Sequence, residues 1–147
     1  TSANGSMFLG RGLSFPIALE GALKLKELSY LHAEGYPAGE MKHGPLALIE
    51  EGLPVIVIAP KDKYFEKTIS NMQEVIARGG KVIMITDDVS ETMSENIRVK
   101  FQIPKTNSTI NSFLLTIPIQ FLAYHVALLK NCDIDKPRNL AKSVTVE

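Results

Sequence analysis

Lys24 and Glu27 are two side chains whose types and spacing could perform proton-transfer chemistry. They lie three residues apart in a segment with helical periodicity, so they share one face of a helix. A carboxylate whose proton affinity is tuned by a neighbouring ammonium could act as a base on a carbon acid. The alternative is a solvated charge ladder with Glu20, worth a few tenths of a kcal/mol. The spacing alone favours the ladder.

His43 lies between Gly39 and Pro45, and glycine and proline restrict the backbone there to a surface loop. Imidazole titrates near neutral pH, so His43 could give or take a proton. An ordinary loop histidine would have the same surroundings. We expect His32 and His125 to lie within helices and to have packing roles.

Lys142 lies near the end of the chain, in the segment 137–147. Leu140 and Val144 of that segment would gain by docking on an apolar surface. A docked, partly desolvated lysine would deprotonate more readily and could form a Schiff base with a carbonyl substrate. A lysine in a free tail would only improve solubility, and composition leaves both interpretations open.

The segment Gly10-Arg11-Gly12 follows an apolar run and precedes a helix, which is the position of a phosphate loop. It contains neither the G-x-G-x-x-G pattern nor the Walker pattern. We therefore interpret it as a tight strand-to-helix turn.

The elements that must position these side chains alternate between strands and helices. Apolar runs predict strands at 7–9, 54–59 and 81–86, the last two typical of strands buried on both faces, and another strand is expected at 98–103. Helical periodicity predicts helices over 17–33, 62–77 and 110–129. A loop is expected over 35–45, and the polar segment 87–96 is expected to hold a short helix.

Buried strands joined by helices require parallel pairing with right-handed crossovers. The predicted fold class is therefore α/β, a three-layer sandwich with about four to five parallel strands, followed by an irregular tail. Ser14 is the expected N-cap of the first helix. Pro118 should kink the last helix or start a new one.

The composition bounds the classes of protein that fit. A chain of 147 residues forms one domain, and its formal net charge of zero argues against nucleic-acid binding. The single cysteine, Cys132, suits a reducing compartment such as the cytoplasm. The stretch 113–129 is judged too short and too polar for a membrane span. Residues 1–6 have the composition of a tag or linker remnant.

Three segments, 18–27, 38–48 and 137–147, resemble the glucosamine-6-phosphate synthases, the glutamine:fructose-6-phosphate aminotransferases. The likeness runs from about residue 7 to the end of the chain. The isomerase half of that family contains two sugar-isomerase (SIS) domains in tandem, and this chain resembles the second. The resemblance implies an SIS domain over 7–130 and a catalytic tail over 131–147.

The resemblance also implies roles for individual residues. Lys142 matches the lysine that forms a Schiff base with open-chain fructose 6-phosphate, and Ala141 beside it belongs to the substrate-binding segment. Glu27 matches the glutamate that moves a proton between C1 and C2, and Lys24 matches the lysine that assists it. His43 matches the histidine of ring opening, which reaches the active site of the other subunit.

The sequence departs from the whole enzyme in two ways. It contains no match to the glutamine-hydrolysing domain, and it lacks the Ser/Thr-rich loop with which the first SIS domain binds the sugar phosphate. We therefore expect a fragment of a longer enzyme, with a homodimeric parent, no cofactor and little turnover of its own. The alternatives are a non-catalytic module that binds sugar phosphates and a simple dimeric sugar-phosphate isomerase.

Overall fold

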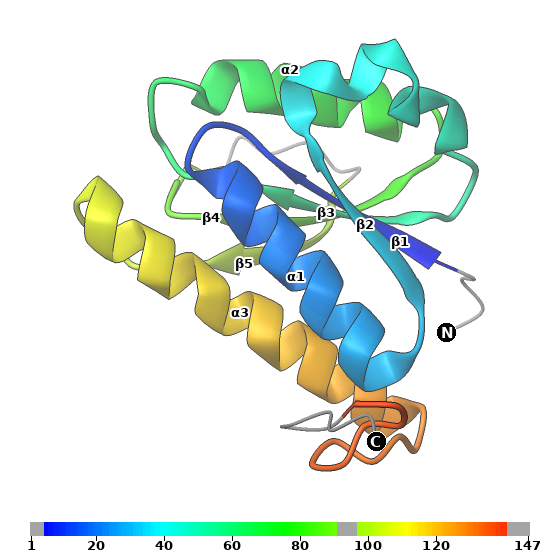
Figure 1. Ribbon diagram of the computed structural model, residues 1–147. Helices are drawn as coiled ribbons and strands as arrows, with labels where there is room; N and C mark the ends of the chain where they lie inside the picture. The colour runs from blue at the N-terminus through cyan, green and yellow to red at the C-terminus, as the bar shows by residue number, and fades with distance from the viewer. Residues whose placement is uncertain (1–4, 91–96, 141–147) are drawn as a thin grey trace, which may run out of the picture.

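A sheet of five parallel strands forms the centre of the computed structural model, which describes residues 5–90 and 97–140. The strands are β1 (Gly5–Gly10), β2 (His32–Pro37), β3 (Pro54–Ile58), β4 (Lys81–Thr86) and β5 (Ile97–Gln102). Their order across the sheet is β2-β1-β3-β4-β5 (Figure 1). The predicted α/β class with about four to five parallel strands is confirmed.

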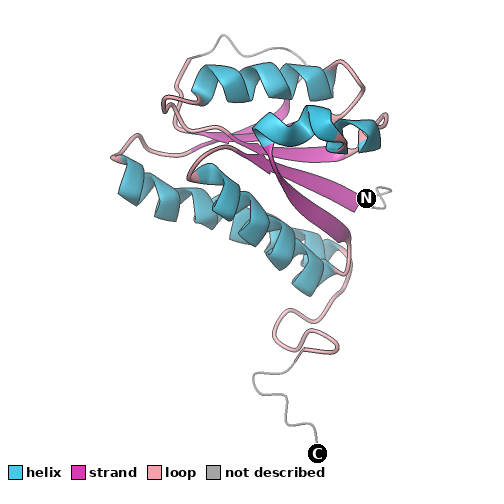
Figure 2. Cartoon of the chain, turned by 45° about the horizontal axis from the view of Figure 1, so that its top comes forward, coloured by secondary structure: helices cyan, strands magenta, loops and turns pink. Residues whose placement is uncertain are grey.

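Helices cover both faces of this sheet (Figure 2). The helices α1 (Ser14–Ser29) and α3 (Ser108–Leu129) lie on one face. The helix α2 (Phe65–Ile76) and the short 3₁₀ helices η1 (Ala38–His43) and η2 (Pro45–Leu48) lie on the other. Successive residues of β1 point to opposite faces, so buried Phe8 packs under α1 and α3 whereas buried Leu9 packs on the α2 side.

The turn between β1 and α1 is as tight as its glycines suggest. The amide of Ser14 donates to the carbonyl of Arg11 at 3.1 Å, and Gly12 has a φ of 57°. At Gly10 a side chain would meet backbone, because a Cβ would lie 2.1 Å from the carbonyl oxygen of Ser14. The interpretation of this segment as a strand-to-helix turn is confirmed.

The first helix is shorter than predicted, because α1 ends at Ser29 rather than continuing to residue 33. The Ser29 hydroxyl donates back to the carbonyl of Leu25, and Tyr30 adopts a left-handed conformation that ends the helix. The chain then forms β2, which pairs with β1 in parallel. The expectation of a loop over 35–45 is also wrong. Residues 35–37 belong to β2, and residues 38–43 form η1.

Smaller differences from the predictions concern single residues. Leu13 occupies the N-cap position of α1, and the predicted N-cap residue Ser14 is instead the first residue of the helix. No side chain makes a capping hydrogen bond there. Gly5 and Ser6, expected to belong to a tag or linker remnant, are the first residues of β1. Pro118 lies inside one continuous helix and starts no new one. Residues 87–90 are not helical, and 91–96 lie outside the described residues.

The helix α3 is apolar on most of its circumference. Its 22 residues have a mean hydropathy of 1.7 in the most apolar window, which satisfies the length and composition of a membrane span. The expectation that this stretch is too short and too polar for a span is therefore wrong by these two measures. In the structure one face of α3 packs against α1 and the sheet, with Leu115, Ile119 and Ala123 buried, as in a core helix.

Candidate functional site

Lys24 and Glu27 lie together on the last turns of α1, as their spacing predicts. The Nζ of Lys24 donates to Oε2 of Glu27 at 2.8 Å and lies 3.8 Å from Oε1 of Glu20. The hydrogen bond to Glu27 raises the pKa of Lys24 above its ordinary value, so Lys24 is an ammonium at neutral pH. Lys24 can therefore donate a hydrogen bond and stabilise negative charge, whereas Glu27 is the member of the pair that can accept a proton.

An open groove of about 470 Å³ separates the end of α1 from the tail. Glu27, Tyr30 and His32 line one side of the groove, and Arg138, Asn139 and Leu140 line the other. Glu27 is half-buried, with 28% of its side chain exposed, so solvent and small molecules can reach the carboxylate. The groove brings the predicted base together with residues 138–140 of the predicted catalytic tail.

Tyr30 and Arg138 make the contact that holds the tail at this groove. The backbone amide of Arg138 donates to the Tyr30 hydroxyl at 2.9 Å, and the Arg138 guanidinium lies 4.1 Å from the centre of the Tyr30 ring. Ala141 and Lys142 follow directly and lie outside the described residues. Sequence reasoning missed Tyr30; the only signal is its position three residues after Glu27, at the end of the same helix.

His43 lies apart from this groove within the chain. It is the last residue of η1, with 75% of its side chain exposed, and its Nε2 is 3.9 Å from Oε2 of Glu40. The predicted surface position is confirmed. The strand β2 starts near the end of α1 and leads to η1 on the opposite face of the sheet (Figure 1). Six residues of strand span about 20 Å, so the structure does not bring His43 to Glu27.

The other two histidines differ from their predicted roles. His32 is on β2 rather than in a helix, is exposed, and lies 3.3 Å from Glu34. His125 is on α3, as predicted, but it is exposed and lies beside the rings of Phe121 and Tyr124. Neither histidine fills a core position, so the packing interpretation is wrong for both.

The carboxyl ends of β1 and β3 are where the strand order reverses, and small ligands often bind at such points. Two of the cations there, Arg11 and Lys61, lie over aromatic rings. The Arg11 guanidinium lies 5.8 Å from the Tyr64 ring centre, and the Lys61 ammonium lies 4.0 Å from the Phe65 ring centre. Both side chains already have partners, so we do not assign them to the candidate site.

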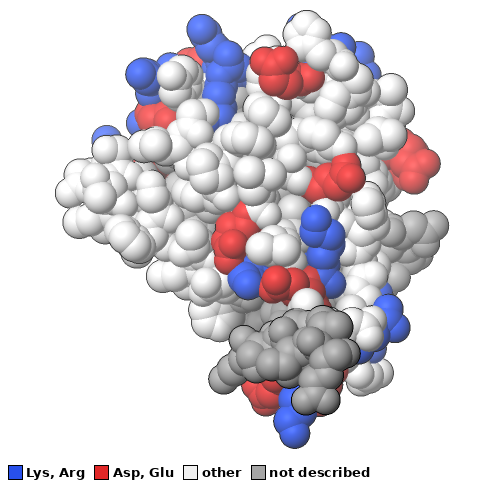
Figure 3. Space-filling model, viewed as in Figure 1, with Lys and Arg blue, Asp and Glu red and all other residues white. Residues whose placement is uncertain are grey.

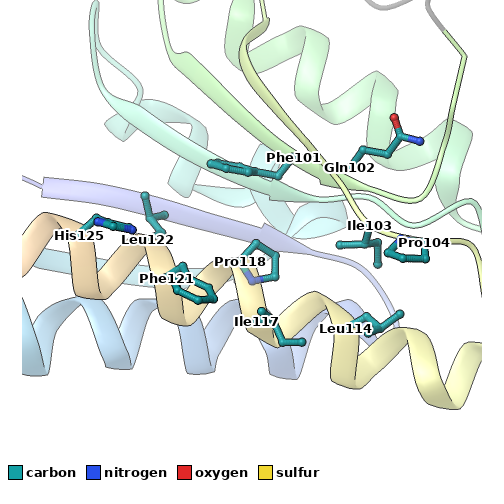
Figure 4. A pocket seen from close by; sticks show the side chains of 10 residues that line it. All are labelled: Phe101, Gln102, Ile103, Pro104, Leu114, Ile117, Pro118, Phe121, Leu122 and His125. Atoms are coloured by element: carbon teal, nitrogen blue, oxygen red, sulfur yellow. The ribbon is translucent and has the colours of Figure 1, made fainter.

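A second hollow, of about 520 Å³, lies between the end of β5 and α3. Figure 4 shows its lining, in which Phe101 and Ile103 face Pro118 and Phe121. The lining is mostly apolar, with Gln102 and His125 as its polar members, so this groove suits packing better than catalysis.

Among residues 5–90 and 97–140, no group of three or more His, Cys, Asp or Glu side chains could hold a metal ion.

Comparison with known proteins places these features in a family. Residues 1–130 match the SIS domain family. The chain belongs to the SIS domain family. The five parallel strands and flanking helices are the SIS fold, which confirms the family predicted from the three motif segments.

Curated relatives share most of the sequence of this SIS domain. The chain is 60% identical over 142 residues to the glutamine–fructose-6-phosphate aminotransferase (isomerizing) of Agrobacterium fabrum, covering 96% of this chain and 23% of that protein. The protein of the same name from Brucella abortus is 58% identical over 148 residues. The match covers all of this chain and 24% of that protein. The chain thus spans about a quarter of the length of the curated relatives it matches.

Solved structures agree with the sequence comparison. The C-terminal domain of glucosamine-fructose-6-phosphate aminotransferase from Francisella tularensis superposes with a TM-score of 0.87 at 47% identity, over 92% of this chain and 38% of that one. A glucosamine-6-phosphate deaminase from Thermotoga maritima superposes with a TM-score of 0.77 at 30% identity, over 98% of this chain and 41% of that one. The SIS domain therefore corresponds to the C-terminal SIS region of the aminotransferases.

Proposed function

We propose that this SIS domain and its tail form part of the active site of an isomerizing glutamine–fructose-6-phosphate aminotransferase. The longer enzyme, acting in the cytoplasm, converts fructose 6-phosphate and glutamine-derived ammonia to glucosamine 6-phosphate. The observation that carries the proposal is the groove in which Glu27 lies beside residues 138–140 of the tail. Lys142 follows two residues later, close enough in the chain to reach the same groove.

The chemistry assigns a separate task to each residue. The Lys142 amine adds to the C2 carbonyl of the open-chain sugar with loss of water, and Ala141 helps to shape the adjoining substrate site. Ammonia then displaces the lysine amine and leaves its nitrogen on C2. The electron-withdrawing iminium acidifies the proton on C1, and Glu27 transfers that proton to C2, while the C1 hydroxyl gives up its proton to the amine and becomes the aldehyde carbonyl. The Lys24 ammonium, hydrogen-bonded to Glu27, keeps the carboxylate oriented.

Ring opening belongs to a second subunit in this proposal. His43 would protonate the ring oxygen, but it lies at the far end of β2 from Glu27. We therefore assign His43 to the site of the partner in a homodimer. The chain contains no Ser/Thr-rich phosphate loop of the kind found in the family, so the other SIS domain of the longer enzyme would bind the phosphate. On its own the chain is expected to show little turnover.

Borohydride trapping tests the Schiff-base assignment in the full-length enzyme. With fructose 6-phosphate and borohydride, the wild type is expected to gain a covalently bound sugar at Lys142. Lys142→Arg should abolish both trapping and synthesis, because a guanidinium does not form the imine. Lys136→Arg, six residues earlier in the same tail, is the matched control and should trap normally. Trapping that survives Lys142→Arg contradicts the assignment, and sugar binding without trapping in the wild type would indicate a non-catalytic module.

We further propose that the exposed face of α3 contacts a second copy of this chain. Its exposed apolar side chains follow at intervals of three and four residues and so form one stripe. They are Ile110, Phe113, Ile117, Phe121, Tyr124 and Leu128. No charged residue occurs from 108 to 129, and Figure 3 shows a broad uncharged surface there. A stripe without charge can pair with itself about a two-fold axis.

The size of this surface favours a dimer. Together with Phe101 and Leu129, the stripe exposes on the order of 700 Å² of apolar side chain, near the roughly 800 Å² per partner of a standard interface. Antiparallel pairing of α3 would bring Phe113 of one copy near Tyr124 and the apolar groove of the other. Patches of this size are uncommon on monomeric proteins.

Sedimentation analysis of this chain tests the surface. We expect a dimer at tens of micromolar, and we expect Phe113→Glu with Phe121→Glu to weaken it at least about a hundredfold, because four charges would be buried without partners. Leu48→Glu, at an exposed apolar residue on the other face of the sheet, is the control and should leave the dimer intact. A monomeric wild type, a dimer that tolerates both glutamates, or adsorption to phosphatidylcholine vesicles in place of dimerisation would each contradict the proposal.

A further inference from the structure

Tyr30 has an unusual backbone for a large side chain. It ends α1 with φ 59° and ψ 17°, the left-handed region that non-glycine residues seldom occupy. Its backbone amide donates to the carbonyl of Lys26 at 3.0 Å, as a helix-ending residue does. Glycine would satisfy this position without strain. A tyrosine there suggests that the side chain itself has a task.

The Tyr30 side chain contacts both the backbone and the side chain of one tail residue. The hydroxyl accepts the Arg138 amide proton, and the ring faces the Arg138 guanidinium. The two residues are 108 positions apart in the sequence. Because a hydrogen bond and a cation–π contact act on the same residue, they select Arg138 rather than a neighbour and so fix the register of the tail.

We propose that Tyr30 is a positioning residue that latches the tail so that Lys142 reaches the groove of Glu27. This inference rests on the proposed function. The helix α3 ends at Leu129, and Lys130 caps it, which leaves twelve residues of tether before Lys142. The latch at Arg138 shortens that tether to four residues, which reach at most roughly 14 Å.

A shorter tether raises the effective concentration of the lysine at the groove. Effective concentration falls as about the −3/2 power of tether length, so going from twelve residues to four gains roughly fivefold. Without the latch, imine formation at Lys142 should slow by about that factor. The KM for fructose 6-phosphate should change little, because the Tyr30–Arg138 contact does not bind the phosphate.

Hydrogen exchange in this chain measures the latch directly. Tyr30→Phe keeps the ring and removes the acceptor, so the Arg138 amide should exchange severalfold faster. Tyr30→Leu removes both contacts and should speed exchange further, whereas Tyr124→Phe on α3 is the control and should have no effect. Unchanged protection of the Arg138 amide in Tyr30→Leu overturns the latch.

Two variants of the tail test the same contact without any substitution at the end of α1. Arg138→Pro removes the amide proton and the guanidinium at an exposed tail residue, while Arg138→Ala removes only the guanidinium. In the full-length enzyme Arg138→Pro and Tyr30→Leu should both slow borohydride trapping about fivefold, with Tyr30→Phe and Arg138→Ala intermediate. If trapping requires Lys142 but ignores all four variants, the latch is wrong and the function stands. If trapping ignores Lys142→Arg, the function itself is wrong.

Discussion

Glu27→Gln in the full-length enzyme is expected to lower turnover of fructose 6-phosphate by about 10²–10⁴-fold, the usual contribution of a general base. Glutamine has the same shape and can still accept the hydrogen bond from Lys24, so the helix should be undisturbed. Glutamine cannot accept the proton from C1, which is the reason for the expected loss of turnover. Because Lys142 is unchanged, its imine with the sugar should still form and should still be trapped by borohydride.

Glu20→Gln provides a matched control for this experiment. Glu20 is on the same helix and lies 3.8 Å from the same Lys24 ammonium, but it is about two turns further from the groove than Glu27. Its replacement should change turnover by less than about twofold, as for a surface ion pair. Equal, small effects of the two substitutions would favour the charge ladder over the proton-transfer pair.

Gly10→Ala is expected to destabilise the fold by more than about 3 kcal/mol, a large part of the stability of an ordinary domain. The added Cβ would lie 2.1 Å from the carbonyl oxygen of Ser14 and 2.8 Å from the amide nitrogen of Phe15. Both are backbone atoms at the start of α1, so neither can move without shifting the helix from β1. The urea midpoint of unfolding measures the loss.

Gly39→Ala is the comparison for that substitution. A Cβ at Gly39 would lie 3.1 Å from the guanidinium of Arg11, which is the end of a long side chain and can move aside. The cost there should stay below about 1 kcal/mol. Similar urea midpoints for the two variants would contradict the prediction that the close approach of α1 to β1 requires glycine at position 10.

The fold could be predicted largely because β1, β3 and β4 carry apolar runs and β5 alternates apolar with polar residues. The strand that was missed is β2, whose sequence His-Ala-Glu-Gly-Tyr-Pro has neither an apolar run nor clear alternation. It is an edge strand, so only one side needs a partner and polar residues are tolerated. Its pairing with β1 and the packing of α1 over Gly35 are tertiary effects that no local pattern contains.

The site was predictable where it depends on local spacing. Helical periodicity placed Lys24 beside Glu27, and the structure has the two in contact. The contact of Tyr30 with Arg138 joins residues at opposite ends of the sequence, so periodicity could not reveal it. The catalytic or binding roles of Lys24, Glu27, His43, Ala141 and Lys142 came from the family resemblance and remain predictions.

The length of β2 has a genetic consequence for the homodimer of the longer enzyme in which His43 serves the partner's active site. Because one end of the strand leads from the helix of Glu27 and the other leads to His43, each active site would take these two residues from different copies. A dimer of one copy damaged at Glu27 and one damaged at His43 would contain one site with both lesions and one site with neither. Two inactive alleles would therefore restore activity in the same cell, the behaviour known as intragenic complementation.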